Sequence, residues 1–194
     1  MNIGKFLFKY RSYTPIPFLI IMLLDCKPNI FSLIGGFGFV LLGEFIRVWS
    51  NAWTGSETRT TGGVGGTYLV ISGPYSHVRN PLYLGNILIY FGLSVMSNAL
   101  FPYLQLFGVL LFFAQYYFII EEEENFLAKK FGNVYQLYLK NVNRFLPKIK
   151  KYFSSDTEQP PYSFNKGFKS EIRSIQAWGI VVIAIVLIWF IRRY

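Results

Sequence analysis

One stretch of the sequence, SGPYSHVRNPLYLGN at positions 72–86, combines turn formers, cations and tyrosines at the edge of an apolar run. Asn80 is a favoured N-cap residue, and Pro81 suits the first position of a helix because the N–H that it lacks would have no partner there. A helix N-terminus presents unpaired N–H groups and a partial positive charge, so it can bind an anion such as a carboxylate. The spacing predicts a helix that begins at Pro81 with an anion site at its first turn.

Three neighbours extend this chemistry. Arg79 adds a full positive charge beside the helix start, and Tyr75 and Tyr83 supply aromatic faces and hydroxyl groups. Such a set suits a flat, partly polar ligand. The simpler alternative is a well-capped helix without a ligand. His77, the single histidine, is interpreted as a loop residue.

The acidic residues gather in one place, EEEE at positions 121–124, directly after an apolar run. Consecutive residues turn by ~100° on a helix, so four glutamates cannot all face one way. We expect one or two to point inward and the others to be solvated. Further along, apolar residues recur at helical spacing and predict an amphipathic helix that covers something apolar: Phe131, Tyr135, Tyr138 and Leu139.

The glycine-rich segment TTGGVGG precedes the first stretch. Its glycines at positions 62, 63, 65 and 66 do not fit the G-x-G-x-x-G fingerprint, and no strand and helix flank them as a dinucleotide site requires. A mobile lid and a plain linker both fit this composition.

The elements that must position these residues are membrane helices. Hydrophobic residues make up 53% of the 194 positions, and they gather into blocks near the ~20 residues that cross a ~30 Å hydrocarbon core. We predict an all-α polytopic membrane protein with about five transmembrane helices, at Pro15–Leu24, Ile30–Trp49, Leu82–Asn98, Phe101–Ile120 and Ile175–Ile191. The first block spans only if the preceding basic residues reach the headgroups.

The cations set the expected orientation. Ten of the nineteen Lys and Arg residues lie between positions 121 and 174, so this segment and the predicted site should be cytoplasmic. Arg192 and Arg193 then fall on the opposite side if the last helix spans, which conflicts with the rule; a helix lying in the interface would remove the conflict. The net charge of +9 is explained by attraction to anionic lipid headgroups, and no nucleic-acid motif is present.

The chain divides into a predicted membrane core at positions 1–151, a linker at 152–174 and a C-terminal membrane helix at 175–194. That last helix either packs against the core or a second copy of the chain, or lines an entrance for a lipid substrate. The single cysteine, Cys26, excludes an internal disulfide and a cysteine-based zinc cluster, and no metal site is predicted.

Two stretches carry a family resemblance. LVISGPYSHVRNPLYLGN, followed by EEEENFLAKKFGNVYQLYLKNVNRFLP, resembles the isoprenylcysteine carboxyl methyltransferase family, whose pattern runs GPY-x-x-x-RHP-x-Y-x-G and then EE-x-x-L-x-x-x-FG-x-x-Y-x-x-Y. The match covers about positions 42–147. Membrane methyltransferases that modify phospholipid amines share the pattern. The resemblance implies an integral membrane enzyme that uses S-adenosylmethionine and has no Rossmann domain.

Position by position, the resemblance implies a cofactor site formed by Thr67, Tyr68, Leu69, Val70, Tyr75, Asn80, Pro81, Leu82, Tyr83 and Glu123. The chemistry agrees, because the helix N-terminus suits the methionine carboxylate and Glu123 can accept hydrogen bonds from the ammonium or ribose hydroxyls. The resemblance assigns no catalytic residue, and direct methyl transfer to a carboxylate or thiolate needs no base.

Two departures from the pattern concern the acceptor. The family's usual histidine is Asn80 here, and Ile119 stands where carboxyl-methylating members carry an arginine. Arg144 is the nearest substitute for binding an acceptor carboxylate. The acceptor therefore stays open between the carboxylate of an isoprenylcysteine-like substrate and a lipid amine, each presented from the membrane.

Two further hypotheses remain at this stage. An NADPH-dependent membrane reductase of the sterol type would show an HPNY-like box where this chain has NPLY. A non-catalytic membrane protein could have kept the fold.

Overall fold

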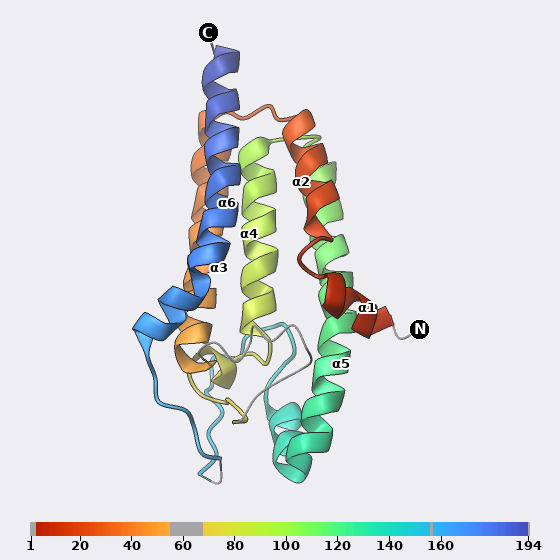
Figure 1. Cartoon of the computed structure of the whole chain (residues 1–194), viewed down its shortest axis with the longest axis vertical. Coiled ribbons are helices and arrows are strands. Elements are labelled where there is room, and N and C mark those ends of the chain that lie inside the picture. Colours follow the sequence, from red (N-terminus) through yellow and green to blue (C-terminus); the bar gives the residue numbers. More distant parts are fainter. Residues whose placement is uncertain (1–2, 55–67, 156, 194) are drawn as a thin grey trace.

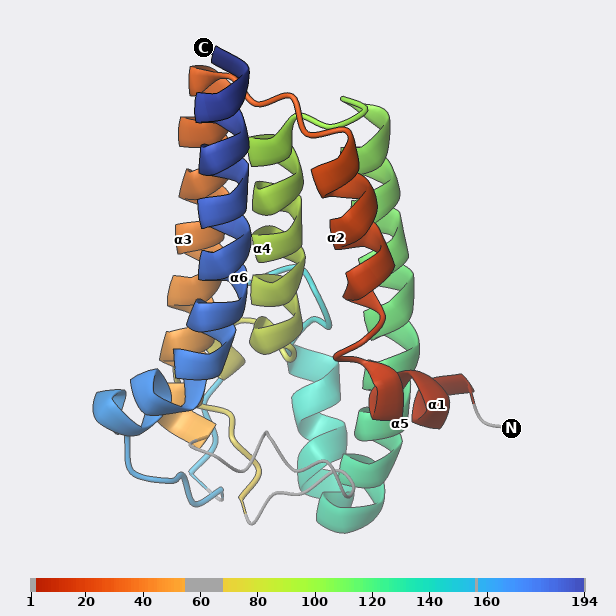
Figure 2. The ribbon, with the colours of Figure 1, turned by 45° about the horizontal axis from the view of Figure 1, so that its top comes forward.

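The computed structural model describes residues 3–54, 68–155 and 157–193. Within these ranges the long elements are all helices, which confirms the all-α prediction, and the main ones run side by side (Figures 1 and 2). In chain order they are α1 (Ile3–Tyr10), α2 (Pro15–Leu24), α3 (Ile30–Thr54), the 3-10 turn η2 (Gly73–Ser76), α4 (Pro81–Ser97), α5 (Tyr103–Asn141) and α6 (Phe164–Arg193).

Three of the described helices, α3, α5 and α6, are long and apolar enough to cross a membrane, whereas α2 and α4 are shorter apolar helices. The predicted count of five spans therefore stays a prediction for α2 and α4. Up to its break at Gly132, α5 rises by ~43 Å at ~1.5 Å per residue, more than a ~30 Å hydrocarbon core, so this part of the helix extends beyond the bilayer. Helix α6 begins at Phe164, ahead of the predicted Ile175, and takes up half of the predicted linker.

The centre of the bundle is the contact between α3 and α4, which is built on two glycine pairs. A Cβ atom on Gly36 would lie 2.5 Å from the carbonyl oxygen of Gly92, and one on Gly43 would lie 2.6 Å from that of Gly85. The two backbones therefore touch, as small residues allow in membrane helices. This close approach fixes α4, and with it the helix start that carries the predicted site.

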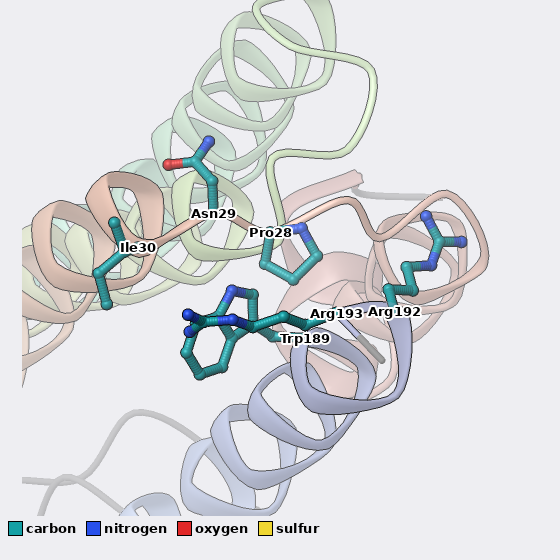
Figure 3. A pocket seen from close by; sticks show the side chains of 6 residues that line it. All are labelled: Pro28, Asn29, Ile30, Trp189, Arg192 and Arg193. Atoms are coloured by element: carbon teal, nitrogen blue, oxygen red, sulfur yellow. The ribbon is translucent and has the colours of Figure 1, made fainter.

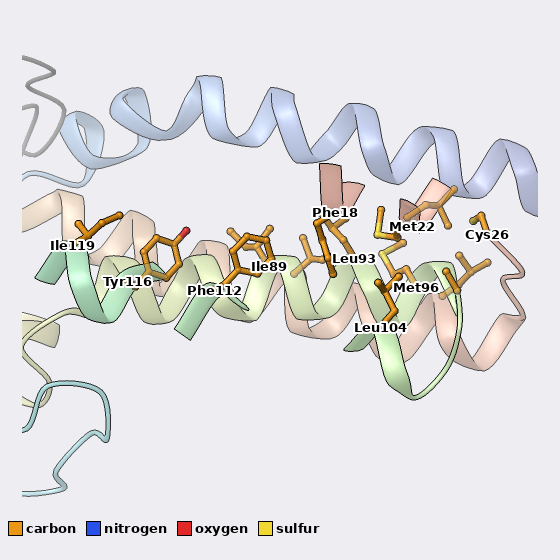
Figure 4. Close-up of a cluster of buried hydrophobic side chains, with 14 of the residues drawn as sticks. Phe18, Met22, Cys26, Ile89, Leu93, Met96, Leu104, Phe112, Tyr116 and Ile119 are labelled. Atoms are coloured by element: carbon orange, nitrogen blue, oxygen red, sulfur yellow. The ribbon is translucent and has the colours of Figure 1, made fainter. Parts of the chain in front are cut away.

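The apolar core joins α2, α4, α5 and α6 around this contact (Figure 4). Phe18 of α2 meets Phe112 of α5 edge to face, with ring centroids 5.2 Å apart, and Ile185 of α6 is fully buried. Many large apolar side chains on α3, α5 and α6 are exposed in the isolated chain, as expected for helices that face lipid.

A second, smaller core lies at the end of α5. The helix breaks at Gly132, where φ is +54°, a value that favours glycine. Beyond the break, Tyr135 and Tyr138 pack with Leu69, Ile71 and Val142. The predicted amphipathic helix is confirmed, and it packs against Leu69 and Ile71 in the segment that leads into η2.

Candidate functional site

Helix α4 begins at Pro81, as predicted, with Asn80 at the N-cap position. The side chain of Asn80 does not cap the helix; its Nδ2 donates to the carbonyl oxygen of Arg144 at 3.3 Å. The predicted helix start is therefore confirmed, but the cap interpretation of the Asn80 side chain is wrong. Leu82 is half-buried on the first turn, where the N–H groups of a helix have no intrahelical partner.

The contact between Tyr83 and Glu123 brings the two sequence motifs together. The Tyr83 hydroxyl donates to Glu123 Oε1 at 2.6 Å, which joins the first turn of α4 to the middle of α5. The ring of Tyr116 lies against Tyr83, with centroids 4.7 Å apart. A carboxylate is thus held within reach of a helix N-terminus, so groups that suit an anion and a cation lie side by side.

The four glutamates divide as their helical geometry requires. Glu121 is exposed, Glu122 pairs with Lys5 of α1 at 3.6 Å, and Glu124 is buried. With Glu123 bound to Tyr83, two of the four point inward, which confirms the expectation for this cluster.

Arg79 is directed to Glu124 and not to the helix start. Its Nε donates to Glu124 Oε1 at 2.9 Å, and its Nη1 donates to the carbonyl oxygens of Leu139 at 3.1 Å and Val142 at 2.6 Å. The guanidinium of Arg79 is therefore held by Glu124, which it shares with Arg144, and its role as a cation for a bound anion stays a prediction. Arg79 connects the residues before α4 to the end of α5.

Arg144 also binds Glu124, through Nη2 and Oε2, and its guanidinium lies 5.0 Å from the ring centroid of Tyr117. Burial disfavours the charged form of Arg144, but the hydrogen bond and charge of Glu124 outweigh burial and raise the pKa of Arg144. Its predicted role as a ligand for the acceptor stays a prediction.

Tyr75 lies in η2, between the end of α3 and the end of α5. Its carbonyl oxygen accepts a hydrogen bond from the Tyr138 hydroxyl at 2.7 Å. Burial raises the pKa of Tyr75, against a smaller opposite effect from its hydrogen bond with Thr54, so the phenol stays neutral. Gly73 has a φ of +59°, and a Cβ there would lie 2.1 Å from Trp53 Nε1. The glycine of GPY is thus required by both backbone conformation and space.

The side chains of the run before η2, residues 68–71, alternate in burial. Leu69 and Ile71 are buried in the second core, whereas Tyr68 and Val70 are half-buried. Thr67, the first residue of the predicted cofactor run, lies outside the described residues, as does the glycine-rich segment.

Gln159, which no sequence motif marks, holds this run. Its Oε1 accepts hydrogen bonds from the backbone N–H groups of Ile71 at 2.8 Å and Ser72 at 3.1 Å, and its Nε2 donates to the Leu69 carbonyl at 2.9 Å. Gln159 lies in a segment interpreted as a linker, and a single amide far along the chain gives no local signal of such a contact.

His77 is a loop residue, as expected. Its Nδ1 lies 2.7 Å from the Lys148 carbonyl oxygen, and the Lys148 N–H donates to the His77 carbonyl at 2.9 Å. The segment after α5 therefore runs beside the RNP turn, where Val78 and Asn143 form an isolated parallel bridge.

A buried polar cluster between α3, α4 and α6 was also missed. Arg47 donates to Glu171 Oε2 from Nε at 3.0 Å and from Nη2 at 2.5 Å, and its Nη1 donates to Asn86 Oδ1. Asn51 Nδ2 donates to Glu171 Oε1, and Glu171 is 0% exposed. Charged residues inside a membrane helix usually face the bundle interior and pair with another polar group. Arg47, within the predicted span at positions 30–49, therefore indicated a buried partner, although not which residue it is.

The buried cluster is continuous with the candidate site. Asn86, which accepts from Arg47, also hydrogen-bonds the Tyr116 hydroxyl, and Tyr116 packs on Tyr83. Tyr83 and Asn86 are three residues apart on α4 and share a face of that helix. The cluster can therefore influence the position of Tyr83.

The site and the helical bundle define an integral membrane protein, and the comparisons assign its family. Residues 31–134, more than half of the chain, match the phospholipid methyltransferase family, so the chain belongs to that family of membrane methyltransferases. The predicted resemblance to this superfamily is confirmed. No solved structure matches the chain.

The chain is also similar to a curated protein, the cobalt-zinc-cadmium resistance protein CzcN of Cupriavidus metallidurans. The two are 36% identical over 118 residues, which cover 61% of this chain and 50% of that protein. The chain thus matches only half the length of this relative. Within the described ranges, no three His, Cys, Asp or Glu side chains gather as ligands for a metal ion.

Proposed function

We propose that the protein is an S-adenosylmethionine-dependent methyltransferase that acts on a lipophilic acceptor at the membrane. The observation that carries the proposal is the hydrogen bond between Tyr83 and Glu123, since it joins the two motifs of the family pattern at the N-terminus of α4. Family membership supports methyl transfer over the reductase and non-catalytic hypotheses.

The residues present suit this cofactor. The unpaired N–H groups of the first turn of α4 would bind its carboxylate, and Glu123 would accept hydrogen bonds from its ammonium or hydroxyl groups. When bound, the cofactor supplies an electrophilic methyl group on a sulfonium. Tyr83 orients the Glu123 carboxylate by donating to it, and the neutral phenol of Tyr75 adds an aromatic wall. The half-buried Tyr68 and Val70 would complete that side.

For the acceptor, the family favours a lipid amine. Arg144, the substitute considered for an acceptor carboxylate, is bound to Glu124, and Ile119 is fully buried.

Titration of the purified protein in detergent micelles separates the hypotheses. By calorimetry we expect S-adenosylmethionine and S-adenosylhomocysteine to bind and NADPH to give no heat. Binding of NADPH alone would support the reductase, and no binding of any of the three would support a non-catalytic protein. A labelled-methyl assay on membrane extracts would then identify the acceptor.

Glu123→Gln tests the site directly. The variant keeps the size of the side chain and removes the charge, so S-adenosylhomocysteine affinity should fall about tenfold, ~1.4 kcal/mol. Glu121→Gln, an exposed neighbour, is the matched control and should bind as the wild type does. An unchanged affinity of Glu123→Gln would remove this residue from the site.

A further inference from the structure

A pocket lies at the end of the bundle remote from the candidate site. It has a volume of about 400 Å³ and is lined by Pro28, Asn29, Ile30, Trp189, Arg192 and Arg193 (Figure 3). The loop between α2 and α3 and the C-terminal end of α6 meet there, whereas η2 and the start of α4 lie at the other end of the bundle (Figures 1 and 2). None of its lining residues belongs to the family motifs.

The charge around this pocket is positive. The nearby Asp25 pairs with Lys27 at 2.6 Å, and the hydrogen bond from Lys27 lowers the pKa of Asp25. Asp25 therefore stays charged and offsets Lys27. Arg192 and Arg193 leave a formal charge of +2 among the described residues of this end.

The two arginines are presented in different ways. The guanidinium of Arg193 lies 5.2 Å from the ring centroid of Trp189, an arrangement in which a cation–π contact holds the flat group in place. Arg192 is close enough to Asp25 and Cys26 for its charge to act on both. The described residues show no ion pair for either arginine, so both guanidinium groups can bind an external anion.

We propose that this pocket binds the phosphate group of an anionic glycerophospholipid in the leaflet on this side. A guanidinium presents paired N–H donors that match two phosphate oxygens. Tryptophan is enriched at the level of lipid headgroups. Phe31 and Ile191, next in sequence to the lining residues, are 85% and 76% exposed and add apolar surface at this end of the bundle.

This binding site also accounts for the orientation conflict in the sequence. With α6 long and apolar enough to span, Arg192 and Arg193 lie at the end opposite the basic segment that follows α5 (Figure 1). Positive residues on that side are unusual for an integral membrane protein. A bound anionic phosphate offsets their charge locally. The inference concerns a different end of the molecule from the methyl-transfer site and does not depend on it.

The test uses the full-length chain in neutral detergent micelles. Native mass spectrometry would compare the retention of phosphatidylglycerol with that of phosphatidylcholine, and inorganic phosphate would serve as a competitor. We expect preferential retention of phosphatidylglycerol, a loss of affinity of at least about tenfold in the double variant R192Q/R193Q, and a smaller loss in R193K, which keeps the charge without the paired donors.

The matched control is K150Q/K151Q, which removes two exposed cations from the other end of the bundle and should retain phosphatidylglycerol as the wild type does. Equal retention by R192Q/R193Q would overturn the proposal, as would an equal loss in the control, since that would indicate a general charge effect. Equal retention of phosphatidylcholine would exclude selection for an anionic lipid. Displacement by millimolar inorganic phosphate would show a site for free anions and not for a lipid.

Discussion

Two buried carboxylates, Glu171 and Glu124, bind arginine in different surroundings. Glu171 lies between helices and is fully buried with Arg47, whose side chain is 12% exposed. Glu124 binds Arg79 and Arg144 at the end of the bundle, where the Arg144 side chain is 26% exposed. The same chemistry therefore serves two purposes: the Glu171 cluster fixes α6 against α3 and α4, and the Glu124 cluster fixes the turn before α4 against α5.

The depth of each cluster determines what its loss should do. Removing one partner of a fully buried pair leaves the other charge without compensation, which costs far more than the pair itself contributes. In the Glu124 cluster, the Arg79 side chain is as buried as that of Arg47, and only the Arg144 side is partly open to water, which limits the cost on that side. Loss of the Glu171 cluster should thus act mainly on stability, and loss of the Glu124 cluster mainly on the site.

Glu171→Ala should have the largest effect on stability. Without this carboxylate, the buried Arg47 guanidinium keeps only Asn86 and the more distant Glu44, at 4.0 Å, as partners, and we expect a loss of about 3 kcal/mol in the free energy of unfolding. Denaturant titration in detergent micelles measures it. Glu158→Ala, at an exposed position, is the control and should differ from the wild type by less than about 0.5 kcal/mol. A loss as small as that control would mean that the pair does not hold α6.

Glu124→Ala should destabilise less and impair cofactor binding more. Arg79 and Arg144 lose their shared partner, but Arg79 keeps its bonds to the Leu139 and Val142 carbonyls. We expect a loss of about 2 kcal/mol in unfolding free energy and a fall of at least about tenfold in S-adenosylhomocysteine affinity, because the turn before α4 loses its ion pair with α5. Glu121→Ala is the control for both. Unchanged affinity together with lost stability would reduce Glu124 to a purely structural role.

The two clusters differ in how much of each could be predicted from the sequence. The apolar parts of α2 to α6, the start of α4 and the inward pair of glutamates follow from local spacing and apolar periodicity, so these were predictable, whereas α1 and the early start of α6 at Phe164 were not. The partners of Arg79 were not, because a guanidinium can reach Glu124 only once α5 has been placed. The Glu171 cluster pairs residues 124 positions apart, a contact that no local pattern encodes, although the charge of Arg47 within an apolar helix indicated a buried partner.

A variant of Gln159 tests whether this residue positions the run at 69–72 or only stabilises the whole fold. Gln159→Ala removes three hydrogen bonds to the backbone of the run at positions 69–72, and we expect a loss of about 1–2 kcal/mol in unfolding free energy. The KM for S-adenosylmethionine should rise several-fold while the KM for the acceptor stays constant. Gln136→Ala, exposed at the same end of the bundle, is the control. An equal rise in both KM values would indicate a general loosening of the fold.

Arg144→Gln should have the smallest effect, and it decides between two roles for this residue. Its bond to Glu124 lies near the surface, and Arg79 remains on the same carboxylate, so we expect a loss of at most about 1 kcal/mol in unfolding free energy. Since the Arg144 guanidinium is already held by Glu124 and lies against the ring of Tyr117, the KM for the acceptor should not change. Arg144→Lys, which keeps the charge, is the comparison variant. A several-fold rise in the acceptor KM in Arg144→Gln, restored in Arg144→Lys, would instead make Arg144 a ligand for an anionic acceptor and favour a carboxylate over a lipid amine.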